Sequence, residues 1–309
     1  MVIEVNNLKK SYGTLVALDH LNLSIKQGEV FGLLGPNGSG KTTAINCMLA
    51  LLDYEEGDIK IFGKDMSPDA YDIKKDIGIV MQNVAVFDEL TTYENIDYFC
   101  GLYVKDKKEK KRLVEEAIAF TGLEDFKKFY PKKLSGGLLR RLNIACGIAH
   151  KPKLIFLDEP TVAVDPQSRN KILEGILELN RNGATIVYTS HYMEEVESIC
   201  SRIMIIDKGK AIATGTKDEL KAMINGGTKV TVETGLINED SLLKLQNLPF
   251  VQTVELIGSQ LQITSKDKDI LEKVLNFLKD EKIAHTSIHS ELPTLNDVFL
   301  EITGTQLRD

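Results

Sequence analysis

Three short segments near the start of the chain alternate apolar and polar residues, as strands with one buried face do. They are residues 2–5, 21–25 and 58–62. Four later segments are apolar at nearly every position, which is typical of strands buried on both faces; they are residues 77–81, 154–157, 184–188 and 203–206. The pattern predicts an antiparallel sheet and a mainly parallel sheet within one chain.

Apolar residues at helical spacing occupy the segments between these strands. The predicted helices cover residues 42–52, 109–120, 138–149, 168–182 and 193–200. Strands and helices alternate along most of the chain, whereas residues from about 82 to 150 are mostly helical. We therefore expect an α/β fold with an antiparallel β subdomain and a helical subdomain at about 82–150.

A second, smaller domain is predicted after residue 224. Residues 216–219 form a capping box that opens a helix running to Ile224, and the Asn-Gly-Gly run at 225–227 then interrupts the chain. Beyond it the predicted order is β-α-β-β-α-β with one added helix, a ferredoxin-like α+β arrangement. The predicted domains are residues 1–224 and 225–309, the second being an accessory or regulatory domain. A small sheet of this kind exposes one face that either the ATPase body or a second copy of the chain can cover, and we favour the second copy.

Residues 35–42 contain the most specific chemical signal in the chain. They read Gly-Pro-Asn-Gly-Ser-Gly-Lys-Thr and match the phosphate-loop pattern G-x-x-x-x-G-K-[ST] without a mismatch. An apolar strand at 30–34 precedes the loop and a helix follows it, so backbone N–H groups and the helix N-terminus can hold phosphate oxygens. Lys41 is expected to reach the β- and γ-phosphates, and the Thr42 hydroxyl to hold Mg²⁺. The predicted nucleotide contacts in this loop are Gly35, Asn37, Gly38, Ser39, Gly40, Lys41, Thr42 and Thr43.

Two consecutive carboxylates follow the buried strand at 154–157. Asp158 is expected to hold Mg²⁺ through water, and Glu159 to polarise the attacking water as a general base. Two acids at a strand end can be merely solubilising charges, but an all-apolar strand beside a phosphate loop favours the catalytic interpretation. The two motifs together predict an ATPase that uses ATP and Mg²⁺.

Composition narrows the choice of partners. The 309 residues carry a net charge of −7, which argues against nucleic acid. The four cysteines lack metal-ligand or C-x-x-C spacing, as in a reduced cytosolic protein. No apolar stretch approaches about 18 residues, so we expect no segment that spans a membrane. Lysines cluster within 105–112 and 127–133, either as a solvated helix face or as a surface near anionic lipid or a membrane partner.

Further motifs resemble the nucleotide-binding subunits of ABC transporters over the predicted first domain. The Leu-Ser-Gly-Gly run at 134–137 resembles the ABC signature, and the Thr-Val-Ala-Val-Asp-Pro run at 161–166 resembles the loop that crosses the dimer interface. The resemblance implies a P-loop NTPase fold in which two subunits sandwich ATP. The residues it assigns to the opposite nucleotide or the interface are Ser135, Gly136, Gly137 and Asp165.

Three single residues also take their expected roles from this resemblance. Tyr12 matches the aromatic residue that stacks on adenine, and Gln82 matches the loop glutamine that contacts Mg²⁺ and senses the permease. His191 matches the switch histidine at the γ-phosphate. The expected catalytic residues are therefore Glu159, His191 and Lys41, and the expected metal site comprises Thr42, Gln82 and Asp158.

The sequence departs from the family pattern at two places. The signature usually ends in Gln, where this chain has Leu138, and the crossing loop often has Gly-Leu, where it has Ala163 and Val164. Leu138 removes a polar side chain near the opposite nucleotide, so we expect weakened capping there without loss of activity. Glu159 and His191 are intact, which favours a competent ATPase.

The C-terminal segment indicates the branch of the family. Residues 294–304 and 159–169 resemble the corresponding runs in ATP-binding subunits of drug and antibiotic exporters of the daunorubicin-resistance type. The resemblance implies a homodimer or heterodimer at the cytoplasmic face of the membrane that energises export of a hydrophobic substrate through separate permease subunits. The alternative is a soluble, non-transport ABC ATPase of the translation or repair type. The single ATP module and the lack of sustained heptads before Leu134 disfavour it.

Overall fold

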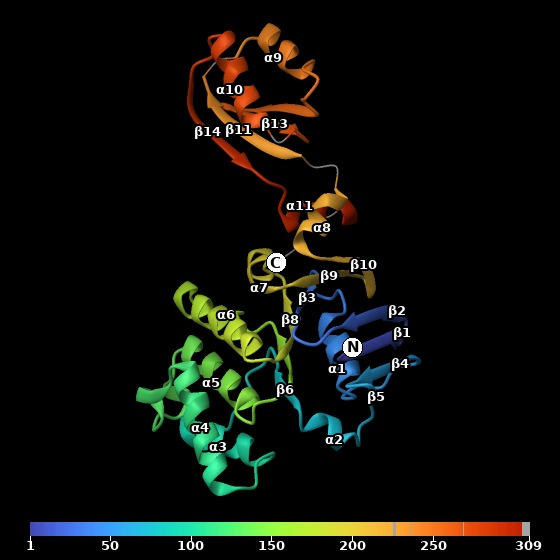
Figure 1. Ribbon diagram of the computed structural model, residues 1–309, viewed down its shortest axis with the longest axis vertical. Coiled ribbons are helices and arrows are strands. Elements are labelled where there is room, and N and C mark those ends of the chain that lie inside the picture. Colours follow the sequence, from blue (N-terminus) through green and yellow to red (C-terminus); the bar gives the residue numbers. More distant parts are fainter. Residues whose placement is uncertain (225–226, 236, 268, 305–309) are drawn as a thin grey trace. The chain divides into compact units, whose positions relative to one another are not determined.

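The computed structural model describes residues 1–224, 227–235, 237–267 and 269–304 (Figure 1). The chain forms two compact units, of which the first comprises Met1–Lys217 and the second begins at Asp218. Within the described ranges, every helix is too short or too polar to cross a lipid bilayer.

The first sheet of the larger unit is antiparallel, as the alternating pattern predicts. Its strand order is β2-β1-β4-β5, and both pairings of β1 are antiparallel. Ile3, Val5 and Leu8 of β1 are buried, whereas Glu4 is only partly buried. The strands are β1 (Ile3–Tyr12), β2 (Leu15–Ile25), β4 (Glu56–Ile61) and β5 (Lys64–Asp65).

The second sheet is parallel except at one edge, and it positions the candidate site. Its order is β10-β9-β3-β8-β7-β6, with β10 antiparallel to β9 (Figure 1). Leu34 pairs with Ser190, and Asp158 pairs with Thr189, so β3, β7 and β8 end side by side. The strands are β3 (Val30–Leu34), β6 (Ile77–Val80), β7 (Leu154–Asp158), β8 (Thr185–Ser190), β9 (Arg202–Asp207) and β10 (Lys210–Gly215).

The core of this unit lies between the two sheets and the helix α1. Ile3 and Leu21 from the first sheet and Phe31 and Phe156 from the second belong to one buried cluster, together with Ile45 of α1. Residues from the predicted strands of both sheets therefore pack in one cluster. The helices of this body are α1 (Lys41–Met48), α2 (Tyr71–Lys74), α6 (Pro166–Arg181) and α7 (Met193–Ile199).

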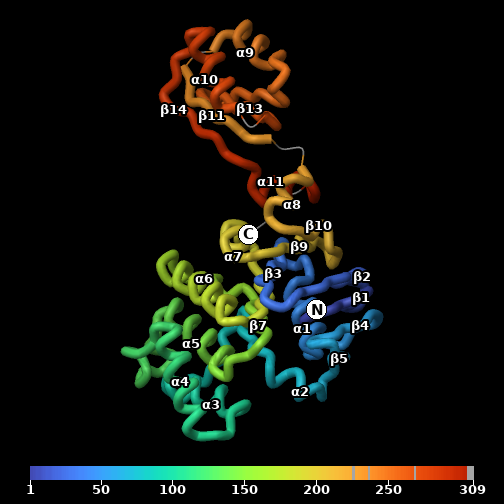
Figure 2. The backbone as a smooth tube through the Cα atoms, viewed as in Figure 1, coloured from blue at the N-terminus to red at the C-terminus, as the bar shows by residue number. Residues whose placement is uncertain are grey.

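All of the helices between β6 and β7 form the predicted helical subdomain, with a core of its own (Figure 2). The apolar spacing of the sequence does not predict its first helix, α3, as a separate element. A capping box marks the start of this helix. Thr91 accepts a hydrogen bond from the Glu94 N–H, and the Glu94 carboxylate accepts one from the Thr91 N–H. The helices are α3 (Thr92–Gly101), α4 (Lys107–Thr121) and α5 (Gly136–Ile148), with 3₁₀ turns at Glu124–Phe126 and Pro131–Lys133.

The second unit contains a ferredoxin-like sheet, in agreement with the predicted β-α-β-β-α-β order. The strand order is β12-β13-β11-β14, with every neighbouring pair antiparallel. Asn225 and Gly226 of the predicted break lie outside the described residues, so the boundary after residue 224 stays a prediction. The elements are α8 (Lys217–Met223), β11 (Thr228–Thr234), α9 (Glu239–Gln246), β12 (Thr253–Ile257), β13 (Gln260–Ser265), α10 (Ile270–Asp280), β14 (His285–Glu291) and α11 (Leu295–Thr303).

The two faces of this small sheet differ in polarity. Val230 and Val232 of β11 and Ile263 of β13 are fully buried in one cluster with Val274 and Leu278 of α10. The register places polar residues on the opposite face, namely Lys229, Thr231 and Glu233 beside Gln260, Gln262, Thr264 and His289. Such a face is stable in water. The expectation that it needs a second copy as cover therefore loses its physical basis.

The first unit should fold and bind ATP without the second. Its buried cluster ends at Ile206, and every candidate catalytic group precedes Lys217. We expect a chain ending at Lys217 to unfold cooperatively. Its affinity for ATP should lie within about threefold of the full-length value, which is a change in binding free energy well under 1.4 kcal/mol.

Calorimetry and thermal melting measure both properties. Sedimentation of both chains with ATP then asks whether residues beyond 217 contribute to self-association. A truncated chain that is unfolded or does not bind ATP would show that the ATPase unit depends on its C-terminal neighbour.

Candidate functional site

The phosphate loop joins the end of β3 to the start of α1. Gly40 has a φ of 109°, and a Cβ atom there would lie 2.6 Å from the Ala17 carbonyl oxygen, so only glycine fits this close approach. Gly40 is also the N-cap of α1 and offers no side-chain acceptor to its first N–H groups. Asn37 and Gly38 are exposed at the tip of the loop. The loop therefore presents backbone donors to an anion.

Lys41 places its ammonium group inside this loop. Nζ donates to the carbonyl oxygens of Gly35 (2.7 Å) and Pro36 (3.1 Å) and lies 3.5 Å from Glu159 Oε1. The side chain is only 5% exposed, and this burial lowers the pKa of Lys41 although Glu159 opposes the shift. An ammonium has three N–H donors, of which two bind these carbonyls and the third can serve Glu159 or a phosphate oxygen.

Ser39 supplies a second sign that the loop is built for a ligand. Its Oγ atom is buried and has no hydrogen-bond partner within the described part of the chain. A buried hydroxyl without a partner is costly unless a bound group completes it. The loop thus fits a polyphosphate by its glycine geometry, its buried ammonium and its unsatisfied hydroxyl.

Asp158 accepts hydrogen bonds from hydroxyl groups of both neighbouring elements. Thr42 Oγ1 donates to Asp158 Oδ2 at 2.9 Å, and Thr189 Oγ1 donates to Asp158 Oδ1 at 2.6 Å. Asp158 is fully buried, whereas Thr42 is exposed at the start of α1. A hydroxyl and a carboxylate held together at a phosphate loop form a set of hard oxygen donors, which suits Mg²⁺.

Glu159 is the residue on which the other predicted groups converge. Gln82 Nε2 donates to its Oε2 at 3.1 Å, and His191 Nδ1 lies 3.4 Å from its Oε1. Its φ of 48° is left-handed, and Thr189 Oγ1 accepts its N–H at 2.9 Å. Left-handed non-glycine residues cost about 1–3 kcal/mol and cluster at functional sites. The structure therefore brings Lys41, Gln82, Glu159 and His191 together.

The predicted interface residues lie apart from this cluster. Ser135 caps α5 by accepting the Leu138 N–H at 3.3 Å, and Ser135 and Gly136 are exposed. Asp165 caps α6 by accepting the Ser168 N–H at 2.9 Å, which lowers the pKa of Asp165. A Cβ on Gly137 would lie 2.6 Å from Ser168 Oγ, so the signature loop packs against the crossing loop of the same chain.

Tyr12 and Thr43 are the remaining residues of the predicted site. Tyr12 ends β1 with its ring 50% exposed, and Lys10 Nζ lies 5.5 Å from the ring centroid. Thr43 lies in the first turn of α1 and is partly buried. The exposed Tyr12 ring leaves a face open for stacking, and its role at adenine stays a prediction.

Leu138 does more than remove a polar side chain near the opposite nucleotide, because it also packs within its own chain. Its side chain is partly buried and packs against the core of the helical subdomain, together with Leu134 and Leu139. The substitution of the usual Gln therefore adds apolar packing below the signature loop. The sequence pattern missed this because periodicity alone does not show which neighbour a first-turn residue touches.

Two residues in this region escaped the sequence analysis. Thr189 bridges Asp158 and the Glu159 backbone, and Glu195 of α7 is a carboxylate only 4% exposed. Glu195 Oε2 accepts hydroxyl hydrogen bonds from Thr161 (2.8 Å), Tyr188 (2.6 Å) and Ser190 (3.0 Å). It thus joins the crossing loop to the end of β8 beside His191. The available signal was the hydroxyl-rich run 188–190 just before that histidine.

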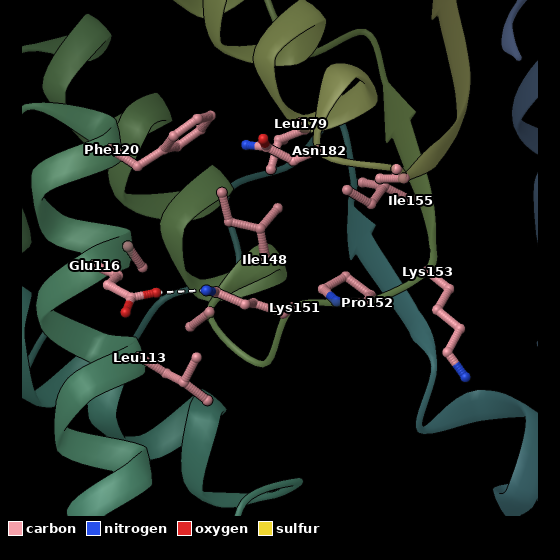
Figure 3. A pocket seen from close by; sticks show the side chains of 14 residues that line it. Leu113, Glu116, Phe120, Ile148, Lys151, Pro152, Lys153, Ile155, Leu179 and Asn182 are labelled. Carbon is pink, nitrogen blue, oxygen red and sulfur yellow. Dashed lines mark ion pairs between the residues drawn. The ribbon is translucent and has the colours of Figure 1, made fainter. Parts of the chain in front are cut away.

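A pocket of about 560 Å³ lies away from these groups, between α4, the segment around Pro152 and the end of α6 (Figure 3). Phe120, Ile148 and Leu179 line it, and an ion pair joins Glu116 to Lys151 at its side. The pocket contains none of the residues predicted to bind nucleotide. The phosphate loop and the strand ends, which carry the candidate nucleotide-binding groups, lie outside this pocket.

Comparison with known proteins gives matches along the whole chain. Residues 18–162 match the family model of the ABC transporter domain, and residues 215–303 match the C-terminal domain of DrrA1-3-like ATP-binding proteins. The linearmycin resistance ATP-binding protein LnrL of Bacillus subtilis is 39% identical, with all of both chains covered. The daunorubicin resistance ATP-binding protein DrrA3 of Streptomyces coeruleorubidus is 33% identical over 99% of this chain and 97% of that protein.

A solved structure agrees with the larger unit. The dimeric ATP-binding cassette MJ0796 in a post-hydrolysis state with ADP and phosphate has a TM-score of 0.64 and 28% identity. It covers 69% of this chain, and the match takes in 98% of the cassette. The phosphate loop, the paired carboxylates and the signature run thus occur within a matching fold. The chain belongs to the ATP-binding proteins of ABC transporters, and it carries the C-terminal domain of their DrrA-like branch.

Proposed function

We propose that Lys41, Glu159 and His191 carry out ATP hydrolysis in this ABC ATPase. The observation that carries the proposal is the convergence of Lys41, Gln82 and His191 on the Glu159 carboxylate. Lys41 binds the phosphates, and Glu159 accepts a proton from the attacking water. His191, whose Nδ1 has no hydrogen-bond partner among the described residues, is positioned to contact the γ-phosphate.

Thr42 and Asp158 are the residues that would hold Mg²⁺, with Gln82 as a further oxygen donor. When bound, the ion neutralises charge on the phosphates. The 2.9 Å hydrogen bond between Thr42 Oγ1 and Asp158 Oδ2 supports this assignment because it keeps both oxygens at the loop. Thr189 holds the other Asp158 oxygen and so fixes the orientation of the carboxylate.

Two subunits are proposed to close on ATP, each offering its signature loop to the nucleotide of the other. Ser135 and Gly136 are exposed at the start of α5, where N–H groups face outward. Asp165 lies close to Gly137 of the signature loop within one chain, so the two would enter the interface together. The dimeric state of the related cassette supports the same arrangement.

Export of a drug, an antibiotic or another hydrophobic substrate through separate permease subunits is the proposed physiological role. It is supported by the full-length similarity to two proteins named for linearmycin and daunorubicin resistance. The protein would then work at the cytoplasmic face of the membrane, bound to its permease. Since this similarity includes the C-terminal domain, it favours the exporter role over the translation or repair alternative.

Growth in hydrophobic antibiotics tests the exporter role. Deleting the gene should lower the inhibitory concentration of at least one compound, and the wild-type gene should restore it. The Glu159→Gln gene should not restore it, although its product should still sediment with membranes. Unchanged resistance across a broad panel, or a product absent from membranes, would refute export.

Lys41→Ala should lose measurable ATP binding. The change removes a charge-assisted contact worth about 3 kcal/mol in a desolvated site, or about 100-fold in affinity. Titration calorimetry measures the affinity, and Lys64→Ala is the matched control because Lys64 is an exposed lysine paired with Asp72. Unchanged affinity in a folded Lys41→Ala protein would contradict the assignment of this loop.

Glu159→Gln should keep ATP binding and reduce turnover by about 10²- to 10⁴-fold, because the amide cannot accept a proton from water. The variant should also accumulate as an ATP-bound dimer in size exclusion. Glu194→Gln is the control, since Glu194 is an exposed neighbour of Glu195 on α7. Wild-type turnover in Glu159→Gln would refute the role of general base.

Leu138→Gln should leave turnover equal or somewhat higher, because it returns a polar group to the interface. It should also lower the free energy of unfolding by about 1 kcal/mol, because Leu138 packs on the helical core. Leu138→Met keeps the apolar volume and should change neither quantity. A collapse of turnover in Leu138→Gln with stability unchanged would show that Leu138 contacts the nucleotide side directly.

A further inference from the structure

Two buried polar side chains of α5 bind the backbone of the segment that carries Gln82. Arg140 NH1 donates to the carbonyl oxygens of Met81 (3.2 Å) and Gln82 (2.8 Å). Asn143 Nδ2 donates to the Met81 carbonyl at 3.3 Å, and Asn143 Oδ1 accepts the Ala85 N–H at 3.1 Å. Arg140 and Asn143 are 7% and 5% exposed.

The burial of Arg140 is unusual because no carboxylate balances it. None of the ion pairs found in the described ranges includes Arg140, and burial lowers the pKa of its guanidinium. A buried charge is costly unless hydrogen bonds compensate it, and here backbone carbonyls at the end of β6 supply them. Hydrogen bonds from a charged donor are about twice as strong as neutral ones. The arginine thus fixes the segment tightly to α5.

The same segment reaches the proposed general base. The Gln82 carboxamide donates to Glu159 Oε2 at 3.1 Å, while the backbone carbonyl of Gln82 accepts a hydrogen bond from Arg140 NH1 at 2.8 Å. The helix that holds this carbonyl begins at Gly136, directly after the Ser135 cap. Arg140 and Asn143, which hold the backbone that orients Gln82, therefore lie one to two helical turns after the signature loop.

We propose that Arg140, assisted by Asn143, is a positioning residue that sets the Gln82 carboxamide on Glu159 and so couples the signature helix to catalysis. The inference rests on the proposed roles of Gln82 and Glu159. Arg140 touches neither substrate nor Glu159, and it acts through the backbone of residues 81–85. A shift of α5 would move that backbone and change the hydrogen bond to the general base.

Steady-state ATPase kinetics of Arg140 and Gln82 variants test this coupling. Arg140→Ala should lower kcat about tenfold with KM for ATP within about twofold, because misplacing a catalytic group costs rate more than binding. Gln82→Ala should give a similar loss. The double variant should be no slower than the slower single variant, since both changes break the same connection. Arg140→Lys should recover part of the loss, because a lysine can still donate to one carbonyl.

Arg141 provides a matched control on the same helix. Its NH1 also donates to backbone carbonyls, those of Thr121 (3.0 Å) and Gly122 (3.3 Å), but these end α4 and lie outside the site. Arg141→Ala should lower the melting temperature comparably while kcat stays within about twofold of wild type. A purely structural role for Arg140 predicts equal kinetic effects for both arginines.

The outcomes separate this inference from the proposed function. If Glu159→Gln and Gln82→Ala slow turnover but folded Arg140→Ala does not, the coupling is wrong and the catalytic roles stand. Multiplicative losses in the double variant also overturn the coupling. If neither Glu159→Gln nor Gln82→Ala slows turnover, the catalytic roles themselves fail. If Arg140→Ala does not fold, Arg140→Lys and Asn143→Ala replace it. Their kcat values, alone and combined with Gln82→Ala, then give the same comparison.

Discussion

Buried charge at the ends of three parallel strands is the constraint on which the rest of this structure depends. Lys41, Asp158 and Glu159 are each at most 5% exposed, and charges removed from water cost several kcal/mol each unless partners surround them. The partners come from every neighbouring element. Thr42 and Thr189 supply hydroxyls, the phosphate loop supplies carbonyls, and Gln82 supplies an amide. The strand register and the close glycine turns place these groups within hydrogen-bonding distance.

The proposed general base is therefore connected to other parts of the chain, one of which, the helical subdomain, has a core of its own. Gln82 links Glu159 to the helical subdomain through the backbone held by Arg140, and Glu195 links the crossing loop to the strand that precedes His191. Each link ends within two residues of a proposed catalytic group. A displacement of either the helical subdomain or the crossing loop would change the surroundings of Glu159, so these elements can influence hydrolysis.

The ferredoxin-like unit is stabilised mainly by apolar packing and not by buried charge. Its buried apolar cluster joins one sheet face to the helices, and the other face is mostly polar, with Ile257 exposed beside Gln260. It contributes no candidate catalytic group. The similarity of this domain to that of DrrA-like proteins makes it a feature of the branch, while the ATPase unit carries the chemistry.

The sequence by itself determined the two-sheet α/β architecture and the ferredoxin-like order, and it predicted the nucleotide site. Periodicity reports burial, and the phosphate-loop pattern combines glycines that allow a close backbone turn with a lysine and a hydroxyl side chain suited to phosphate and Mg²⁺. Helix α3 has no individual prediction from apolar spacing, and its capping box is seen in the structure.

Tertiary structure decided what depends on neighbours distant in the sequence. Leu138 packs into the helical core, and the open face of the small sheet is polar rather than a surface that needs cover. Thr189, Arg140 and Glu195 hold other residues rather than ligand, and their partners lie up to 59 positions away. A local pattern records whether a side chain is buried, whereas the atom it binds is fixed only when the chain has folded.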